Sequence, residues 1–145
     1  MTKLLLTALA ASAAFACGSS PFDPPVRRLG TLQTTEDGFA IEVPDTVQAR
    51  QSFEISAKTT GNGCVSFGGT EVEVEGSVVE FRPFDLDVAF GRDDVFCTEI
   101  LKVFDHAASV QIDQPGTVTV RIHGMAHTSD GNLGEIVIER IVVVS

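Results

Sequence analysis

Apolar and polar residues alternate along most of the chain after residue 38. The runs 39–43, 52–58 and 117–123 each place apolar side chains at every second position. Successive side chains of a strand point to opposite faces of a sheet, so a period of two predicts strands with one buried face. No run carries a strong helical pattern. The alternation therefore predicts an all-β domain.

Turn-forming residues separate these runs at short intervals. The alternating runs 71–75 and 77–82 flank a Gly-Ser turn, which predicts a β-hairpin. A Gln114-Pro115-Gly116 turn introduces the clearest run of the second half. About eight or nine short strands at such spacing predict an antiparallel β-sandwich.

Three runs of the second half are less regular. Residues 98–104 are apolar enough for a strand, although their adjacent apolar pairs would also fit a helical turn, and residues 110–112 predict a short strand. The closing run, 135–145, shifts its apolar positions from even to odd numbers, which predicts a β-bulge at 139–140. The residues that define this shift are Ile136, Ile138, Ile141 and Val143.

Residues 1–16 have the composition of a signal peptide. Lys3 supplies positive charge, and residues 4–16 are apolar but too short to span a bilayer comfortably. Ala14-Phe15-Ala16 precedes Cys17, a pattern that resembles the lipobox of bacterial lipoproteins. The resemblance implies an exported lipoprotein of the outer membrane or cell surface, facing the periplasm or the exterior, with lipid on Cys17. The alternative is ordinary secretion, which leaves Cys17 as a free thiol.

We expect residues 17–36 to form a flexible tether behind the lipidated cysteine, and residues 37–145 to form the folded domain. The Gly, Ser and Pro residues of 18–25 cannot form a helix or a central strand. Arg27 and Arg28 lie in this tether and are interpreted as solvated. The alternative for both is contact with anionic lipid headgroups.

The number of cysteines, three, supports the assignment of Cys17 as the lipidated residue. Lipidation of Cys17 leaves Cys64 and Cys97, which are expected to pair in an oxidising compartment. The alternative is two buried thiols. A zinc site is less favoured because the sequence lacks a CxxC motif or a cysteine–histidine spacing of the usual kind. Closure of a loop of this length stabilises a fold by roughly 3–4 kcal/mol in the chain-entropy model.

Length and charge narrow the class of protein further. The 145 residues suit a single domain, and the 43% of hydrophobic residues can fill one core. The formal net charge of −10 argues against a nucleic-acid partner, because phosphate-binding surfaces need clustered Lys and Arg. Most acidic residues are spread along the predicted strands and indicate a solvated face.

Two stretches resemble bacterial immunoglobulin-like domains. Pro44-x-x-Val47 followed by Phe53-x-Ile55 is similar to their opening, and the run 115–121 is similar to a late strand that follows a proline-glycine turn. The resemblance covers residues 39–145 and implies an immunoglobulin-like β-sandwich. The Trp and Tyr that often mark such cores are absent, because both counts are 0.

Motifs that could bind a metal are incomplete, so we predict no metal and no cofactor. His123 and His127 have the spacing of a helical zinc pair, but they follow a strand pattern and lack a general base. The segment 130–135 offers oxygen ligands without the full spacing of a calcium loop. Four acidic residues around the cysteine pair could collect a cation, although a solubilising rim is favoured. These are Asp85, Asp87, Asp93 and Asp94.

Two classes of function remain. The first is a non-catalytic binding or structural module of the bacterial cell envelope, held at the membrane by its lipid anchor, with an envelope protein or a glycan as partner. The second is an envelope enzyme or metal-binding protein whose site is assembled from His106, His123 and Asp105. We favour the first, because no catalytic motif is present, and a loop from Gly124 to Gly134 is its candidate binding loop. The binding residues in that loop are Met125, His127, Asp130 and Asn132.

Overall fold

The structure is a computed structural model that describes residues 23–145. The predicted signal peptide and Cys17 lie outside the described residues. Strands make up 64% of the described chain, which contains no helix, and hence no helix long and apolar enough to cross a membrane. The all-β prediction is confirmed.

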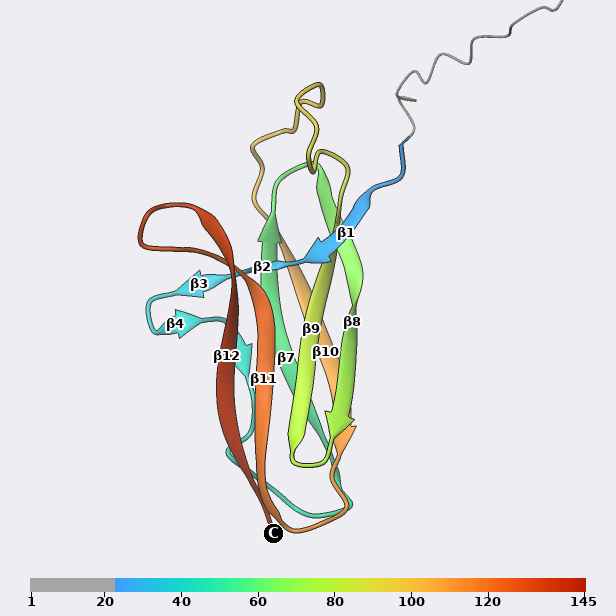
Figure 1. Cartoon of the computed structure of the whole chain (residues 1–145), viewed down its shortest axis with the longest axis vertical. Coiled ribbons are helices and arrows are strands. Elements are labelled where there is room, and N and C mark those ends of the chain that lie inside the picture. Colours follow the sequence, from blue (N-terminus) through green and yellow to red (C-terminus); the bar gives the residue numbers. More distant parts are fainter. Residues whose placement is uncertain (1–22) are drawn as a thin grey trace, which may run out of the picture.

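Six long strands and six short ones form the fold (Figure 1). The short ones are β1 (Val26–Leu29), β2 (Thr31–Leu32), β3 (Thr34–Thr35), β4 (Gly38–Phe39), β5 (Ile41–Glu42) and β6 (Thr46–Val47). The long ones are β7 (Ser52–Gly61), β8 (Val65–Glu75), β9 (Val78–Asp87), β10 (Lys102–Gln111), β11 (Gly116–His127) and β12 (Leu133–Val144).

Ten strands belong to one curled sheet that encloses a core in the manner of a sandwich. β8, β9, β11 and β12 lie side by side on one side, and β7 pairs with β10 on the other (Figure 1). The long hairpins are antiparallel, whereas β11 runs parallel to β9. The predicted hairpin around Gly76 is confirmed, because Glu75 of β8 pairs with Val78 of β9.

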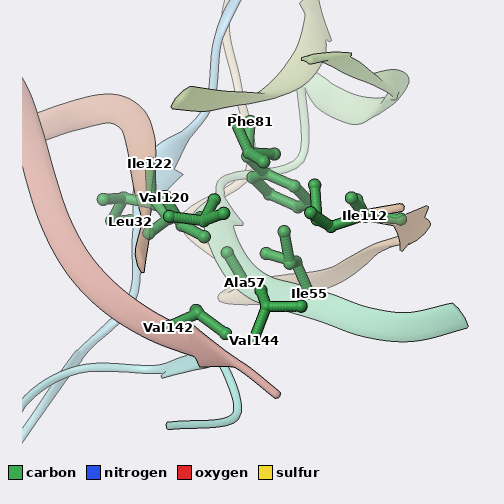
Figure 2. Packing of buried hydrophobic residues seen from close by; sticks show 12 residues of the cluster. Leu32, Ile55, Ala57, Phe81, Ile112, Val120, Ile122, Val142 and Val144 are labelled. Carbon is green, nitrogen blue, oxygen red and sulfur yellow. The ribbon is translucent and has the colours of Figure 1, made fainter. Parts of the chain in front are cut away.

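The core lies between these two groups of strands. Phe81 of β9, Ile122 of β11 and Ile55 of β7 are completely buried and pack into one cluster (Figure 2). Each sits at an inward position of an alternating run, so the period of two that predicted the strands also selected the core. Burial of side chains of this size stabilises the fold by roughly 1.5–3 kcal/mol each.

The expectation of a flexible tether up to residue 36 is wrong from residue 26 onwards. β1 pairs with β9, from Val26 opposite Asp87 to Leu29 opposite Phe84. The chain then crosses toward β7 at Gly30, where a Cβ atom would lie 2.5 Å from Thr59 Cγ2. Proline before this segment excludes a helix, but it does not prevent a short strand from pairing with β9.

Arg27 and Arg28 are consequently not merely solvated. Arg27 lies with its guanidinium carbon 3.8 Å from the centre of the Phe84 ring and forms an ion pair with Glu71. Arg28 forms a half-buried ion pair with Asp87, with 3.0 Å between Nη2 and Oδ2. Both side chains fasten β1 to the sheet.

The two strands predicted at 98–104 and 110–112 are not separate strands in the structure. A single strand, β10, spans Lys102–Gln111, and residues 97–101 contain no strand. Ile100 and Leu101 are exposed. Their adjacent apolar side chains could not both face a core, because neighbouring strand residues point to opposite faces.

The predicted bulge in the closing strand is also wrong. β12 pairs with β11 without a register shift, and the buried positions stay at even numbers through Val142 and Val144. Ile141 and Val143 are about half exposed, and Arg140 is exposed although it has the even-numbered parity of the buried positions. A charged residue at such a position of an edge strand discourages pairing with other chains.

Candidate functional site

The connection between β9 and β10, residues 88–101, is the candidate site, and we call it the apical loop. It extends beyond the ends of the strands, at the end of the molecule where β1 enters the sheet (Figure 1). The sequence predicted strands for parts of this segment. The structure instead shows an irregular loop anchored at both ends.

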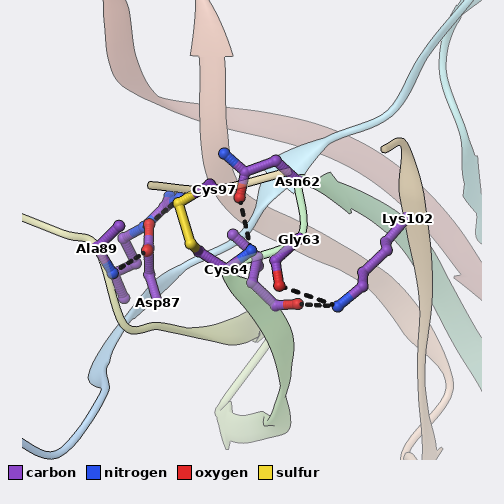
Figure 3. The surroundings of a disulfide bond; sticks show 9 residues. Asn62, Gly63, Cys64, Asp87, Ala89, Cys97 and Lys102 are labelled. Carbon is purple, nitrogen blue, oxygen red and sulfur yellow. Dashed lines mark hydrogen bonds and ion pairs between the residues drawn. A yellow bond between two sulfur atoms is a disulfide. The ribbon is translucent and has the colours of Figure 1, made fainter. Parts of the chain in front are cut away.

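A disulfide fastens the apical loop to the connection between β7 and β8. Cys97 in the loop is bonded to Cys64, just before β8, with 5.3 Å between their Cα atoms (Figure 3). The predicted pairing is confirmed, and the alternative of two buried thiols is excluded. The bond joins residues 33 positions apart, so it removes most of the freedom that this part of the chain has when unfolded.

Hydrogen bonds hold the chain on both sides of the disulfide. The Gly63 amide donates to Thr98 O at 2.9 Å, and the Val88 amide donates to Cys64 O at 3.2 Å. Lys102 donates from Nζ to Val65 O at 3.1 Å (Figure 3). Main-chain hydrogen bonds therefore join both ends of the loop, at Val88 and Thr98, to residues 63–64 just before β8, in addition to the sulfur bridge.

The first turn of the loop is ordered by Asp87. Its Oδ1 accepts a hydrogen bond from the Ala89 amide at 2.9 Å, while its Oδ2 pairs with Arg28 (Figure 3). The Arg92 amide then donates to Ala89 O at 2.9 Å. One carboxylate thus couples β1, the end of β9 and the start of the apical loop.

Arg92 organises the charges at the tip. It donates to both carboxylate oxygens of Asp94, at 3.2 and 3.0 Å. This hydrogen bonding lowers the pKa of Asp94 and raises the pKa of Arg92. Arg92 Nη1 also lies 3.8 Å from Asp23 Oδ2, so the start of the described chain is located beside the loop.

The apical loop exposes apolar side chains that a folded domain would ordinarily bury. Phe96 is 97% exposed, Leu101 76%, Phe90 55% and Ile100 53%. Val88 is also exposed. Single exposed apolar residues are common, but several on one anchored loop are typical of a contact surface. The loop is thus held in place while its apolar side chains are exposed to solvent.

A polar cluster lies buried beside the core, below the anchored end of the loop. His106 Nε2 lies 3.0 Å from Thr59 Oγ1 and 3.3 Å from Asp85 Oδ1. On the other side of the ring, Nδ1 lies 3.0 Å from Thr70 Oγ1. The ring of Phe67 covers the imidazole, with 4.8 Å between the ring centres.

This cluster has the residue types of a hydrolytic triad but not the access. Three hollows in the described surface are lined by residues between 35 and 58 together with Asp105 and Ser145, and His106 lines none of them. Both His106 and Asp85 are almost completely excluded from solvent. The cluster satisfies the hydrogen-bonding needs of a buried histidine, and it does not present a nucleophile to a substrate.

The three residues considered for an enzyme site are not brought together. Asp105 neighbours His106 on β10 but points outward, where it pairs with Lys58. His123 pairs with Glu80, and their hydrogen bond lowers the pKa of that carboxyl group. Asp105, His106 and His123 therefore each contact a different partner, and they do not form one site.

The candidate metal ligands are likewise dispersed. His123 and His127 are four residues apart on β11, which separates them by about 13 Å along a strand. Asp85 is buried with His106, Asp87 pairs with Arg28 and Asp94 pairs with Arg92. Within residues 23–145 no group of three or more His, Cys, Asp or Glu side chains is placed to hold a metal ion.

The predicted binding loop is shorter than expected. β11 continues to His127 and β12 begins at Leu133, so Met125 and His127 belong to a strand and only residues 128–132 form the turn. Asp130 and Asn132 lie in that turn. Hydrogen bonds from Thr128 and Asn132 lower the pKa of Asp130 to about 2. The turn therefore satisfies its polar groups internally.

Sequence reasoning missed the apical loop because residues 98–101 were assigned to a strand that continues to residue 104. The signal was present in the adjacent pairs Val95-Phe96 and Ile100-Leu101, which cannot both face one core. The buried Thr–His–Asp cluster had no signal of this kind, because its members lie on four different strands.

Comparison with known proteins finds no matching family model, no matching curated protein and no matching solved structure.

Proposed function

We propose that this chain is a non-catalytic binding module of the bacterial cell envelope, tethered to a membrane through a lipidated Cys17 and making contact through its apical loop. The observation that carries the proposal is the exposure of Phe90, Phe96, Ile100 and Leu101 on a loop that a disulfide anchors. A preorganised loop loses little conformational entropy when it binds, so its apolar area contributes more fully to affinity.

The disulfide also supports the proposed location in the cell envelope. Disulfides persist in oxidising compartments such as the periplasm and the cell surface, and Cys64 and Cys97 are paired here. With those two joined, Cys17 is the third and last cysteine of the chain. It stands directly after the lipobox-like Ala14-Phe15-Ala16, which supports its modification by lipid.

Fractionation tests the tether. Full-length protein should be recovered with the membrane fraction, and Cys17→Ala should move it to the soluble fraction or block its processing. Cys17→Ser offers a second, nearly isosteric variant. Wild-type membrane association of both variants, at normal abundance and with residues 1–16 removed, would reject lipidation of Cys17.

Envelope capture tests the contact surface. Phe96→Ser and Leu101→Ser should reduce recovery of any envelope component that the intact protein retains. Ile141→Ser and Val143→Ser on β12 remove similar exposed apolar groups from another face and serve as matched controls. Equal loss in the loop variants and the β12 variants would reject the apical loop as the contact surface.

The enzyme alternative has one observation in its favour, the contact between His106 and Asp85. The surrounding residues weigh against it, because Phe67 covers the ring and the three described hollows lie elsewhere. We therefore retain the binding module.

A further inference from the structure

We infer that the partner of the apical loop is the lipid bilayer itself, with Phe96 and Leu101 inserted among the headgroups of the membrane that holds the tether. This inference rests on the proposed tethering through Cys17. It adds that the domain does not extend freely from its anchor but is seated on the membrane by one defined loop.

The first described residue, Asp23, lies beside the apical loop, which supports the seating of this loop on the membrane. Asp23 lies 3.8 Å from Arg92 in the apical loop, and it stands six positions after Cys17 in the sequence. A chain of that length spans at most about 20 Å when fully extended. A lipid on Cys17 would therefore place the membrane surface within reach of the apical loop.

The exposed side chains suit an interfacial contact. Five of the thirteen large exposed apolar side chains in the described chain lie on the apical loop. They are Val88, Phe90, Phe96, Ile100 and Leu101. Transfer of an aromatic or aliphatic side chain from water to an apolar environment is favourable, and apolar side chains placed at the headgroup level add to the membrane affinity of a lipid anchor. A second, apolar contact would strengthen that attachment.

The charges indicate which lipids the loop prefers. Asp93, Asp94 and Glu99 lie on the loop, and the chain carries a formal net charge of −10. Arg92 neutralises only Asp94 directly within the loop. Anionic headgroups would repel this surface, so the contact should be apolar in origin and strongest on zwitterionic lipid.

The absence of Trp and Tyr from the chain permits a direct test. Phe96→Trp in the full chain introduces a single fluorophore at the proposed contact, and Leu101→Trp provides a second one. Val74→Trp reports from an exposed position on β8, close to its hairpin turn with β9, and is the matched control. Each protein is isolated with its native processing and reconstituted with vesicles of phosphatidylcholine and phosphatidylethanolamine, with and without brominated acyl chains.

We expect Trp at 96 and at 101 to shift its emission to shorter wavelength and to be quenched by brominated lipid, while Trp at 74 does neither. In protein with Cys17→Ala, the further change Phe96→Ser should reduce vesicle partitioning about tenfold, since roughly 1.5 kcal/mol of apolar burial is lost. Addition of phosphatidylglycerol should weaken partitioning of the Cys17→Ala protein.

Mass spectrometry of the N-terminal peptide separates the two proposals. Lipidated protein whose Trp at 96 and 101 stays as solvent-exposed as Trp at 74 would overturn the bilayer contact and leave the tether intact. Unlipidated protein whose loop is still quenched by brominated lipid would overturn the tether and support the contact. Shielding of Trp at 96 only after addition of an envelope protein fraction would assign the loop to a protein partner and overturn the inference.

Discussion

His106 Nε2 lies 3.3 Å from Asp85 Oδ1 inside the sandwich, and no more than 1% of either side chain is accessible to solvent. His106 also contacts Thr59 and Thr70, so one imidazole connects β7, β8, β9 and β10. Asp85 Oδ2 has no hydrogen-bond partner among the described residues. The imidazole of His106 therefore joins these strands through side-chain contacts, in addition to their backbone pairing.

Replacement of His106 by Ala should destabilise the protein strongly. The change leaves Thr59, Thr70 and Asp85 without their common partner, and each buried polar group left unpaired costs roughly 1–3 kcal/mol. We expect a loss of about 3 kcal/mol in the free energy of unfolding, measured with denaturant. Ser109→Ala, at an exposed position of the same strand, is the control and should change the free energy by less than about 0.5 kcal/mol. Similar small losses for both would contradict a structural role for the cluster.

Removal of the disulfide should loosen the apical loop without changing the fold. The double variant Cys64→Ser and Cys97→Ser should lose roughly 3–4 kcal/mol of stability, while its far-ultraviolet circular dichroism remains that of a β protein because the core strands are unaffected. Peptide mapping without reductant should recover the two cysteines of the wild type in one cross-linked species. Two alkylatable thiols in the native protein would show that the bond does not form.

Gly30 should not tolerate a side chain. An added Cβ would lie 2.5 Å from Thr59 Cγ2 and 2.6 Å from Asp85 Oδ2, so Gly30→Ala must displace the crossing between β1 and β2. Overpacking of this kind costs roughly 1–3 kcal/mol, measurable as a lower unfolding midpoint. Gly134→Ala is the control, because its Cβ would meet only the methyl group of Thr128, at 3.2 Å. A midpoint unchanged by Gly30→Ala would mean that the chain does not pass this close to the core.

The turn at Asp130 should titrate well below an ordinary aspartate. Hydrogen bonds from Thr128 and Asn132 lower the pKa of Asp130 to about 2. Because the pKa is lower in the folded protein, any stability it contributes is present above the unfolded pKa of about 4 and is lost as pH falls toward 2. Carboxyl chemical shifts followed by nuclear magnetic resonance should show the low midpoint in the wild type. In Thr128→Ala the midpoint should move upward, and an unchanged midpoint would exclude the Thr128 hydroxyl as the main cause.

Arg140 should protect the edge of the sheet. It lies on β12 between Ile138 and Val142 and shares their even-numbered parity, but its side chain is exposed, and a charge on an edge strand hinders pairing with a second chain. Arg140→Val should therefore increase self-association, detected by sedimentation at rising protein concentration. Arg121→Val removes one positive charge from the neighbouring strand β11 and controls for net charge. Monomeric behaviour of Arg140→Val at every concentration would exclude this role.

The alternation of side chains by itself determined the all-β class, the β8–β9 hairpin and most of the core, because a period of two can bury one face only in a strand. The number of cysteines, with Cys17 assigned to the lipid, predicted that Cys64 and Cys97 pair, because a single pair then remains. The tertiary structure decided the features that depend on contacts distant in sequence. Residues 26–29 form the strand β1 because they pair with residues 84–87 of β9. β12 kept its register because twelve consecutive pairs with β11 outweighed the local preference of Ile141 and Val143 for burial. The apical loop was left outside the core because Cys64 and Gly63, just before β8, hold Cys97 and Thr98 at the rim of the sandwich.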